Sequence, residues 1–189
     1  APRSAGPASA GCRALFVGSD MDSNVHGLSQ FLETVWPKVR ARVPAAALDV
    51  VGSVKDRFPA PKDPSVAFHG VVDDLADSYR RATVVVSPVL IGAGLKIKCI
   101  DALARGKALV VSKHSADGFV FDDDAPPFIV AENDGGFADA IVHLLTDSAA
   151  REQLETRARG FVNSRYSDET VFRPLRDAIR DVIESKRAR

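Results

Sequence analysis

Short apolar runs alternate with segments of helical periodicity along almost the whole of this 189-residue chain. The six runs that are rich in Val, Ile, Leu, Phe and Ala cover residues 13–18, 48–53, 66–72, 83–89, 107–112 and 128–132. Runs that are apolar at consecutive positions are typical of strands buried on both faces, as in a parallel sheet. Strands that alternate with helices supply the crossovers that such a sheet needs. The chain is therefore predicted to form an α/β fold, a Rossmann-like three-layer sandwich with a six-stranded parallel sheet.

The segments between and after these runs carry apolar residues at helical spacing. Helices are predicted over residues 25–43, 73–82, 95–105, 135–147, 149–166 and 168–186, with a Pro-rich surface loop at 54–64. Residues 1–11 are rich in Ala, Pro, Gly and Ser and are interpreted as a linker. Residues 12–189 are predicted to form one domain, with C-terminal helices from about 148 to 187. The linker and the lack of an initiating Met lead us to expect a piece of a longer protein.

Parallel α/β sheets bind ligands beyond the carboxyl ends of their strands, at the point where the strand order reverses. Four loops follow predicted strands at that edge, over residues 18–27, 52–56, 70–74 and 88–94. The fourth contains Gly92 and Gly94 and runs directly into a predicted helix. Glycine lets a backbone approach a ligand closely, and the free N–H groups of a helix N-terminus attract anions. We therefore expect an anion site at this loop.

Two lysines at the start of that helix reinforce the expectation, because cations are favoured at the opposite end of a helix. On the predicted helix, Gly94, Lys98 and Asp101 share one face, and Lys96 flanks the mouth of the site. Amides and an ammonium suit phosphates, and a carboxylate two turns later suits a sugar diol. That order matches a nucleoside diphosphate. The alternative is an ordinary helix surface, with Asp101 paired to Arg105 and both lysines solvated.

Composition excludes several other classes of function. The 25 Lys and Arg residues balance 25 Asp and Glu residues, so we expect no nucleic-acid partner. No apolar run approaches the roughly 18–20 residues of a membrane span, and the first ten residues lack the apolar core of a signal peptide. Cys12 and Cys99 are expected to be free thiols in a reducing compartment, which favours the cytoplasm. The acidic run 122–124 is interpreted as a solvated loop.

The segment PVLIGAGLKIKCIDALARGKALVVS, residues 88–112, resembles the donor-binding motif of the group 1 (GT4-like) glycosyltransferases of the GT-B fold. The motif is matched at Gly94, Lys96, Lys98, Asp101 with Ala102, and Gly106. Further segments agree in order and spacing, among them FVGS, LDVVGS and VAFHGVVDDL, so that the resemblance covers about residues 14–168.

The resemblance implies that this domain is the C-terminal half of a two-domain enzyme and holds a nucleoside-diphosphate sugar as donor substrate, with no covalently bound cofactor. The N-terminal acceptor domain would be missing, so the fragment alone would transfer nothing. Transfer would be of the retaining type, with UDP or GDP as leaving group, and the whole protein would serve polysaccharide synthesis at the inner membrane surface as a peripheral enzyme. The donor-binding residues implied are Gly18, Ser19, Asn24, Gly92, Ala93, Gly94, Leu95, Lys96, Lys98 and Asp101.

The chain departs from the family pattern in three ways. The acid of the motif is usually Glu, and Asp101 is shorter. The other acid of the family's pair would fall at Ala93. The loop GSDMDSNVHG after the first strand lacks the usual Arg and Lys, for which Asn24 or His26 could substitute. Two alternatives therefore stay open: a non-catalytic α/β nucleotide-binding or regulatory module, and half of a nucleotide-sugar epimerase.

The remaining histidines carry little signal. His69 ends a strand at the predicted ligand edge, while His114 and His143 have no partner pattern, so that no metal site is expected.

Overall fold

A computed structural model describes residues 12–92, 94–120 and 126–187 of the chain. Its sheet has six parallel strands in the order β3-β2-β1-β4-β5-β6. The strands are β1 (Arg13–Val17), β2 (Ala47–Val51), β3 (Val66–Gly70), β4 (Val84–Ser87), β5 (Leu109–Ser112) and β6 (Ile129–Ala131). This is the doubly wound order, in which the winding reverses between β1 and β4. The predicted fold class is confirmed, and each predicted strand is present with its ends shifted by a few residues.

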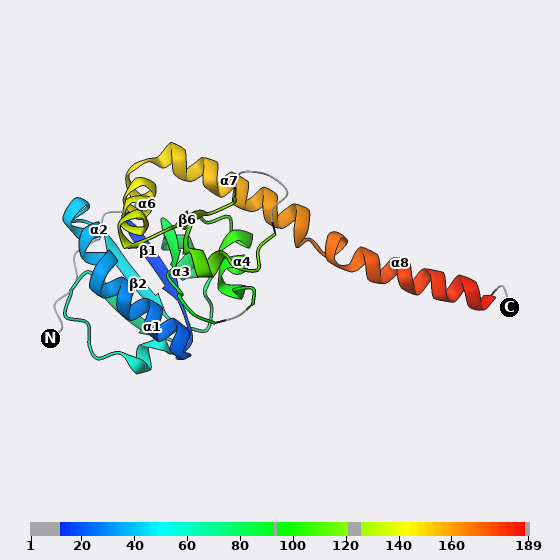
Figure 1. The fold of residues 1–189 in the computed structure, drawn as a ribbon, viewed down its shortest axis with the longest axis horizontal. Coiled ribbons are helices and arrows are strands. Elements are labelled where there is room, and N and C mark those ends of the chain that lie inside the picture. The colour runs from blue at the N-terminus through cyan, green and yellow to red at the C-terminus, as the bar shows by residue number, and fades with distance from the viewer. Residues whose placement is uncertain (1–11, 93, 121–125, 188–189) are drawn as a thin grey trace.

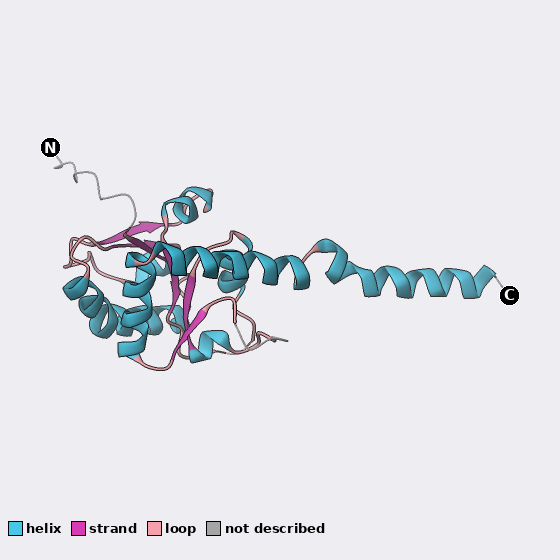
Figure 2. Ribbon diagram, turned by 90° about the horizontal axis from the view of Figure 1, so that it is seen from above, coloured by secondary structure: helices cyan, strands magenta, loops and turns pink. Residues whose placement is uncertain are grey.

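Helices cover both faces of the sheet, which gives the three layers seen in Figures 1 and 2. On one face lie α1 (Asp22–Gln30), α2 (Trp36–Arg42) and α6 (Asp134–Thr146), packed over side chains such as Phe16 and Val50. On the other lie α3 (Ala76–Arg81), α4 (Ile97–Ala104) and α7 (Ser148–Arg165), packed over Leu15 and Val51. Successive strand residues point to opposite faces, which is why both cores draw on the same strands.

The helix predicted at 25–43 is wrong in its bounds and in its regularity. It begins three residues early, at Asp22, and contains a π-helical turn, η1 (Phe31–Val35), before α2. Pro37 lies in the first turn of α2, where it offers no N–H to the preceding turn. A wider turn before a proline removes the need for that hydrogen bond.

Three other local features differ from prediction. The start of the predicted loop 54–64 is a 3-10 turn, η2 (Ser53–Arg57). Helix α3 begins three residues later than predicted, because the Asp74 carboxylate accepts a 2.8 Å hydrogen bond from the Ala76 amide. A short helix, α5 (Lys113–Ala116), follows β5 and was not predicted.

The last helix, α8 (Asp168–Arg187), extends away from the sheet sandwich (Figure 1). Its apolar stripe, the sidechains of Val171, Phe172, Leu175, Ile179, Val182 and Ile183, is about half exposed. The helix was predicted at nearly these bounds, but periodicity alone did not reveal that its apolar stripe is half exposed.

Some predictions lie outside the described residues: the linker at 1–11, the solvated acidic loop at 122–124, and any role of Ala93. Within the described residues, no helix is both long and apolar enough to cross a membrane. Cys12 and Cys99 are both free cysteines.

Candidate functional site

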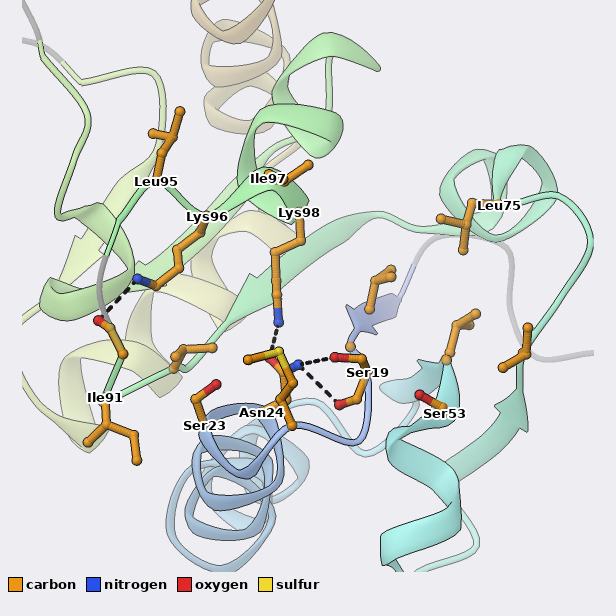
Figure 3. A pocket seen from close by; sticks show the side chains of 18 of the residues that line it. Ser19, Ser23, Asn24, Ser53, Leu75, Ile91, Leu95, Lys96, Ile97 and Lys98 are labelled. Atoms are coloured by element: carbon orange, nitrogen blue, oxygen red, sulfur yellow. Dashed lines mark hydrogen bonds between the residues drawn. The ribbon is translucent and has the colours of Figure 1, made fainter.

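A cavity of about 610 Å³ opens at the carboxyl edge of the sheet, where β1 and β4 diverge (Figure 3). All four loops that the sequence placed at this edge contribute to its lining. Gly18, Ser19, Met21, Ser23 and Asn24 come from the first loop and helix, Gly52 and Ser53 from the second, Val71 and Val72 from the third, and Val89, Ile91 and Gly92 from the fourth. The cavity therefore occupies the position at which this strand order is expected to bind a ligand.

The β1–α1 side of the cavity is built around Asn24 in the first turn of α1. Its side chain is almost fully buried, with 6% of the residue exposed. The amide nitrogen donates to the Ser19 carbonyl at 3.0 Å and to Ser19 Oγ at 3.1 Å. These bonds fix the orientation of the amide, because only its nitrogen can donate to the carbonyl oxygen of Ser19. The amide oxygen of Asn24 consequently points into the cavity.

The close approach of α1 to the start of the β4–α4 segment depends on Gly27. A Cβ atom at this position would lie 2.5 Å from the Pro88 carbonyl oxygen and 3.0 Å from Val89 Cα. Because both are backbone atoms, a side chain could not be accommodated without moving the helix or the segment. Gly27 thus allows Asn24 to reach the opposite side of the cavity.

The β4–α4 side contains the glycine-rich loop. Gly92 and Gly94 have φ values of 105° and 78°, a region that favours glycine. Lys96 caps α4 in an extended conformation, and its ammonium donates to the Gly94 carbonyl at 2.8 Å and to the Gly92 carbonyl at 3.4 Å. The Lys96 ammonium is therefore hydrogen-bonded to the backbone of the glycine-rich loop.

Lys98, in the first turn of α4, extends across the cavity (Figure 3). Its ammonium donates to the Asn24 amide oxygen and lies 4.9 Å from the centre of the Phe16 ring, in a cation–π contact. Burial lowers the pKa of Lys98 to about 8, with the nearby charge of Lys96 acting in the same direction. The ammonium has a neutral amide and a ring as its partners, so its charge is not balanced by a carboxylate in these contacts.

The far wall of the cavity is apolar and comes from Val71, Val72 and Leu75, together with Val51. Ile97 adds an aliphatic side chain on the α4 side. Among the described residues that line the cavity, the charged ones are Lys96 and Lys98, and both are cations. The site can accept a ligand with an anionic group near Lys98 and a less polar group against the aliphatic wall.

The structure brings together seven of the ten predicted site residues in the lining of this cavity: Gly18, Ser19, Asn24, Gly92, Leu95, Lys96 and Lys98. Gly94 is in the same loop but is not among the described lining residues. The prediction that Gly94 shares a helix face with Lys98 is wrong, because α4 begins at Ile97 and Gly94 precedes it. The apolar residues on either side of Lys96 hid this later start.

Asp101 lies one helical turn beyond Ile97 and is also not among the described lining residues. Its carboxylate accepts a 3.1 Å hydrogen bond from Arg105 Nε, which is the ion pair that the sequence offered as the alternative. A role for Asp101 toward a ligand stays a prediction.

The histidines do not join the cavity lining. His26 is exposed on α1, and His114 pairs with Asp117 at 3.3 Å. His69 Nε2 lies 2.8 Å from a carboxylate oxygen of the buried Asp49, on the β2–β3 side of the sheet.

Sequence reasoning identified the loops but missed the apolar lining residues within and beside them. Met21, Leu75, Ile91 and Ile97 line the cavity although each carries an aliphatic or thioether side chain. The signal that could have found them is position, since Met21 and Ile91 lie in predicted ligand loops and Ile97 lies between the two lysines.

The model of the family described as "Glycosyl transferases group 1" matches residues 11–147 of the chain. A phosphatidyl-myo-inositol mannosyltransferase from Mycolicibacterium smegmatis is 30% identical over 155 residues, which cover 78% of this chain and 40% of that protein. The chain spans less than half the length of the curated relatives it matches.

Solved structures share the fold at lower identity. A mutant of S. aureus TarM in complex with fondaparinux, α-GlcNAc-glycerol and UDP is 17% identical, with a TM-score of 0.72, over 93% of this chain and 37% of that one. Anabaena HepE in complex with UDP is 11% identical, with a TM-score of 0.69, over 92% of this chain and 50% of that one.

Proposed function

This chain belongs to the group 1 glycosyltransferases, and on that premise we propose that its cavity binds the nucleoside diphosphate of a nucleotide-sugar donor. The observation that carries the proposal is the position of Lys98. Its ammonium stands in the cavity at the switch point of the sheet, at the N-terminus of α4, with an uncharged amide as its hydrogen-bond partner. A diphosphate would supply the missing negative charge.

The pyrophosphate lies between the glycine-rich loop and Asn24 in this proposal. Lys98 donates to it, and the free N–H groups at the start of α4 add a partial positive charge. Hydrogen bonds between charged groups are stronger than neutral ones, so Lys98 contributes most of the phosphate affinity. The aliphatic wall formed by Val71, Val72 and Leu75 receives the base, and Asp101 receives the ribose hydroxyls, as the family resemblance implies.

The reaction that such a site serves is transfer of a glycosyl group from the donor to an acceptor. Negative charge grows on the departing diphosphate in the transition state, and a cation already in place lowers the energy of that state. We assign the acceptor site to a further domain of a longer protein, in keeping with the share of the relatives that the chain spans. Transfer with retention of configuration, and a cytoplasmic location consistent with two free thiols, complete the proposal.

A second candidate is a nucleotide-binding module without transferase activity. It is favoured by the β1–α1 side, where the described residues that line the cavity are uncharged and include no Arg or Lys. The two candidates differ in activity and not in nucleotide binding. An assay of the longer protein with labelled donor separates them, because Lys98→Ala lowers transfer only in a working transferase.

Calorimetric titration of the chain with UDP, GDP and UMP tests the proposed site. The tightest of the nucleoside diphosphates should bind roughly 10- to 100-fold more weakly to Lys98→Ala than to the native chain, because a hydrogen bond to a charged group is worth about 1.5–3 kcal/mol. Lys38→Ala, which removes an exposed lysine of α2, is the matched control and should bind like the native chain. A folded native chain that binds none of the nucleotides, or an Lys98→Ala variant that binds them normally, would contradict the proposal.

A further inference from the structure

The side chains of Tyr79 in α3, Asp101 in α4 and Arg105, the residue after α4, lie together near one end of the cavity. Leu75, directly before α3, and Ile97, at the start of α4, line its wall. Tyr79 and Asp101 lie four residues further along, just over one helical turn or about 6 Å beyond each of them. Residues four apart share a helix face, so this pair adjoins the end of the cavity where Leu75 and Ile97 stand.

Arg105 connects the two members of this pair. Its Nε donates to an Asp101 carboxylate oxygen at 3.1 Å, and its guanidinium carbon lies 4.7 Å from the centre of the Tyr79 ring. Because the guanidinium is already stacked on the Tyr79 ring, it loses little additional freedom when it bonds to the Asp101 carboxylate. Asp101 is thereby kept on the side of α4 that faces Tyr79.

The Tyr79 hydroxyl is the unusual group in this arrangement. Only 2% of the residue is exposed, and the hydroxyl has no hydrogen-bond partner within bonding geometry among the described residues. Burial and then the neighbouring negative charge of Asp101 raise the pKa of Tyr79 well above its usual range. Buried hydroxyls are nearly always hydrogen-bonded, so the unpaired hydroxyl of Tyr79 is unusual. The neighbouring Asp101 carboxylate is an acceptor that it can bond.

Resting on the proposed function, we propose that Tyr79 and Arg105 are positioning residues that orient the Asp101 carboxylate toward the ribose hydroxyls of the bound nucleotide. A carboxylate has two oxygens with about four lone-pair sites. Arg105 occupies one of them and the Tyr79 hydroxyl lies next to the carboxylate, which leaves the remaining sites for the cavity end beside Leu75. The Tyr79 hydroxyl has no hydrogen-bond partner among the described residues, and a small movement of Asp101 on nucleotide binding gives it one.

The test compares UDP with 2′,3′-dideoxyuridine diphosphate, which keeps the base and the pyrophosphate and lacks both hydroxyls. The native chain should bind UDP roughly 10- to 100-fold more tightly than the dideoxy analogue, since hydrogen bonds to a charged group are strong. Asp101→Asn should remove most of that preference. Tyr79→Phe should reduce it by roughly 3- to 10-fold, with affinity for the dideoxy analogue unchanged. Tyr166→Phe, which alters the other tyrosine of the chain, should leave both affinities as they are.

The preference between the two nucleotides distinguishes positioning from a purely structural role. The inference would be overturned if Tyr79→Phe weakened the binding of both nucleotides equally, or if the native chain showed no preference for UDP. The proposed function would stay intact in either case if Lys98→Ala still weakened the binding of both nucleotides. A chain that binds neither nucleotide overturns both. Because the hydroxyl is unpaired, Tyr79→Phe should melt no lower than the native chain. If it does not fold, Arg105→Gln provides the same comparison from the exposed side of the cluster.

Discussion

On the β4–α4 side of the cavity, two lining lysines lie two residues apart, whereas the lining residues of the β1–α1 side, among them Ser19 and Asn24, are uncharged. The two sides meet at one bond, from the Lys98 ammonium to the Asn24 amide oxygen. An amide at this point holds the lysine across the cavity without neutralising it. The neutral side is therefore as important as the charged one. A carboxylate at the position of Asn24 would pair with the Lys98 ammonium and make it unavailable to a phosphate.

Placing a charge on the neutral side is expected to have the largest effect. Asn24→Asp keeps the size of the side chain but puts a carboxylate against Lys98, so that the two form a buried ion pair and the carboxylate repels the diphosphate. Juxtaposed like charges cost several kcal/mol, and UDP affinity measured by calorimetry should fall by about 100-fold or more.

Ser29→Asp, which adds the same charge to α1 outside this cavity lining, should bind UDP within about twofold of the native chain, because the added carboxylate does not contact the bound phosphate. Retained affinity in a folded Asn24→Asp variant would show that the phosphate does not lie between Asn24 and Lys98.

Changing the charge of Lys98 by pH should have the next largest effect. The pKa of Lys98 is lowered to about 8, chiefly by burial. The ammonium form, which prevails below that pKa, binds the diphosphate, and the neutral form, which prevails above it, does not. The dissociation constant for UDP should therefore rise about tenfold between pH 7 and pH 9.

The same pKa fixes the sign of a stability effect. An unfolded lysine binds its proton up to about pH 10.5, so the unfolded chain holds more protons than the folded chain between about pH 8 and pH 10.5. Burying the charged form costs stability below that window, and the contribution of Lys98 to stability rises with pH across it. Lys98→Met should flatten both profiles, and an unchanged binding profile in that variant would assign the pH dependence to another group.

Removing the second cation should have the smallest effect. The Lys96 ammonium already donates hydrogen bonds to the Gly92 and Gly94 carbonyls, so it is less available to a phosphate than Lys98. Partly exposed charges contribute about 0.2–1 kcal/mol, so Lys96→Ala should weaken UDP binding by only about two- to fivefold in a calorimetric titration. A loss as large as that of Lys98→Ala would mean that the two lysines act as equals, which the difference in their contacts does not support.

Much of this fold could be predicted from the sequence, because continuous apolar runs and helical periodicity are local patterns. The strands, the switch point and the four ligand loops follow from them. Within the site, Lys98 and Asn24 were both expected, but their contact joins residues 74 positions apart and depends on how closely Gly27 lets α1 approach. No local pattern encodes such a distance.

The errors have similar causes. We predicted a helix from residue 95, but Lys96 is an extended cap between two apolar residues and α4 begins only at Ile97. We predicted a regular helix across Pro37, but this residue has no N–H for an α-helical bond and a π-helical turn precedes it. The exposed stripe of α8 has the same periodicity as a buried helix, because periodicity shows which face is apolar and not what covers it.

The account depends on contact between the Lys98 ammonium and a bound diphosphate, and proton uptake tests that contact most directly. UDP binding is measured at pH 8 by calorimetry in buffers of different ionisation enthalpy, for the native chain and for Lys98→Met. With a pKa of about 8, Lys98 is half protonated when the site is empty and fully protonated when the phosphate is bound. The native chain should take up about half a proton and the variant none, whereas zero uptake by the native chain, or equal uptake by both proteins, would contradict the account.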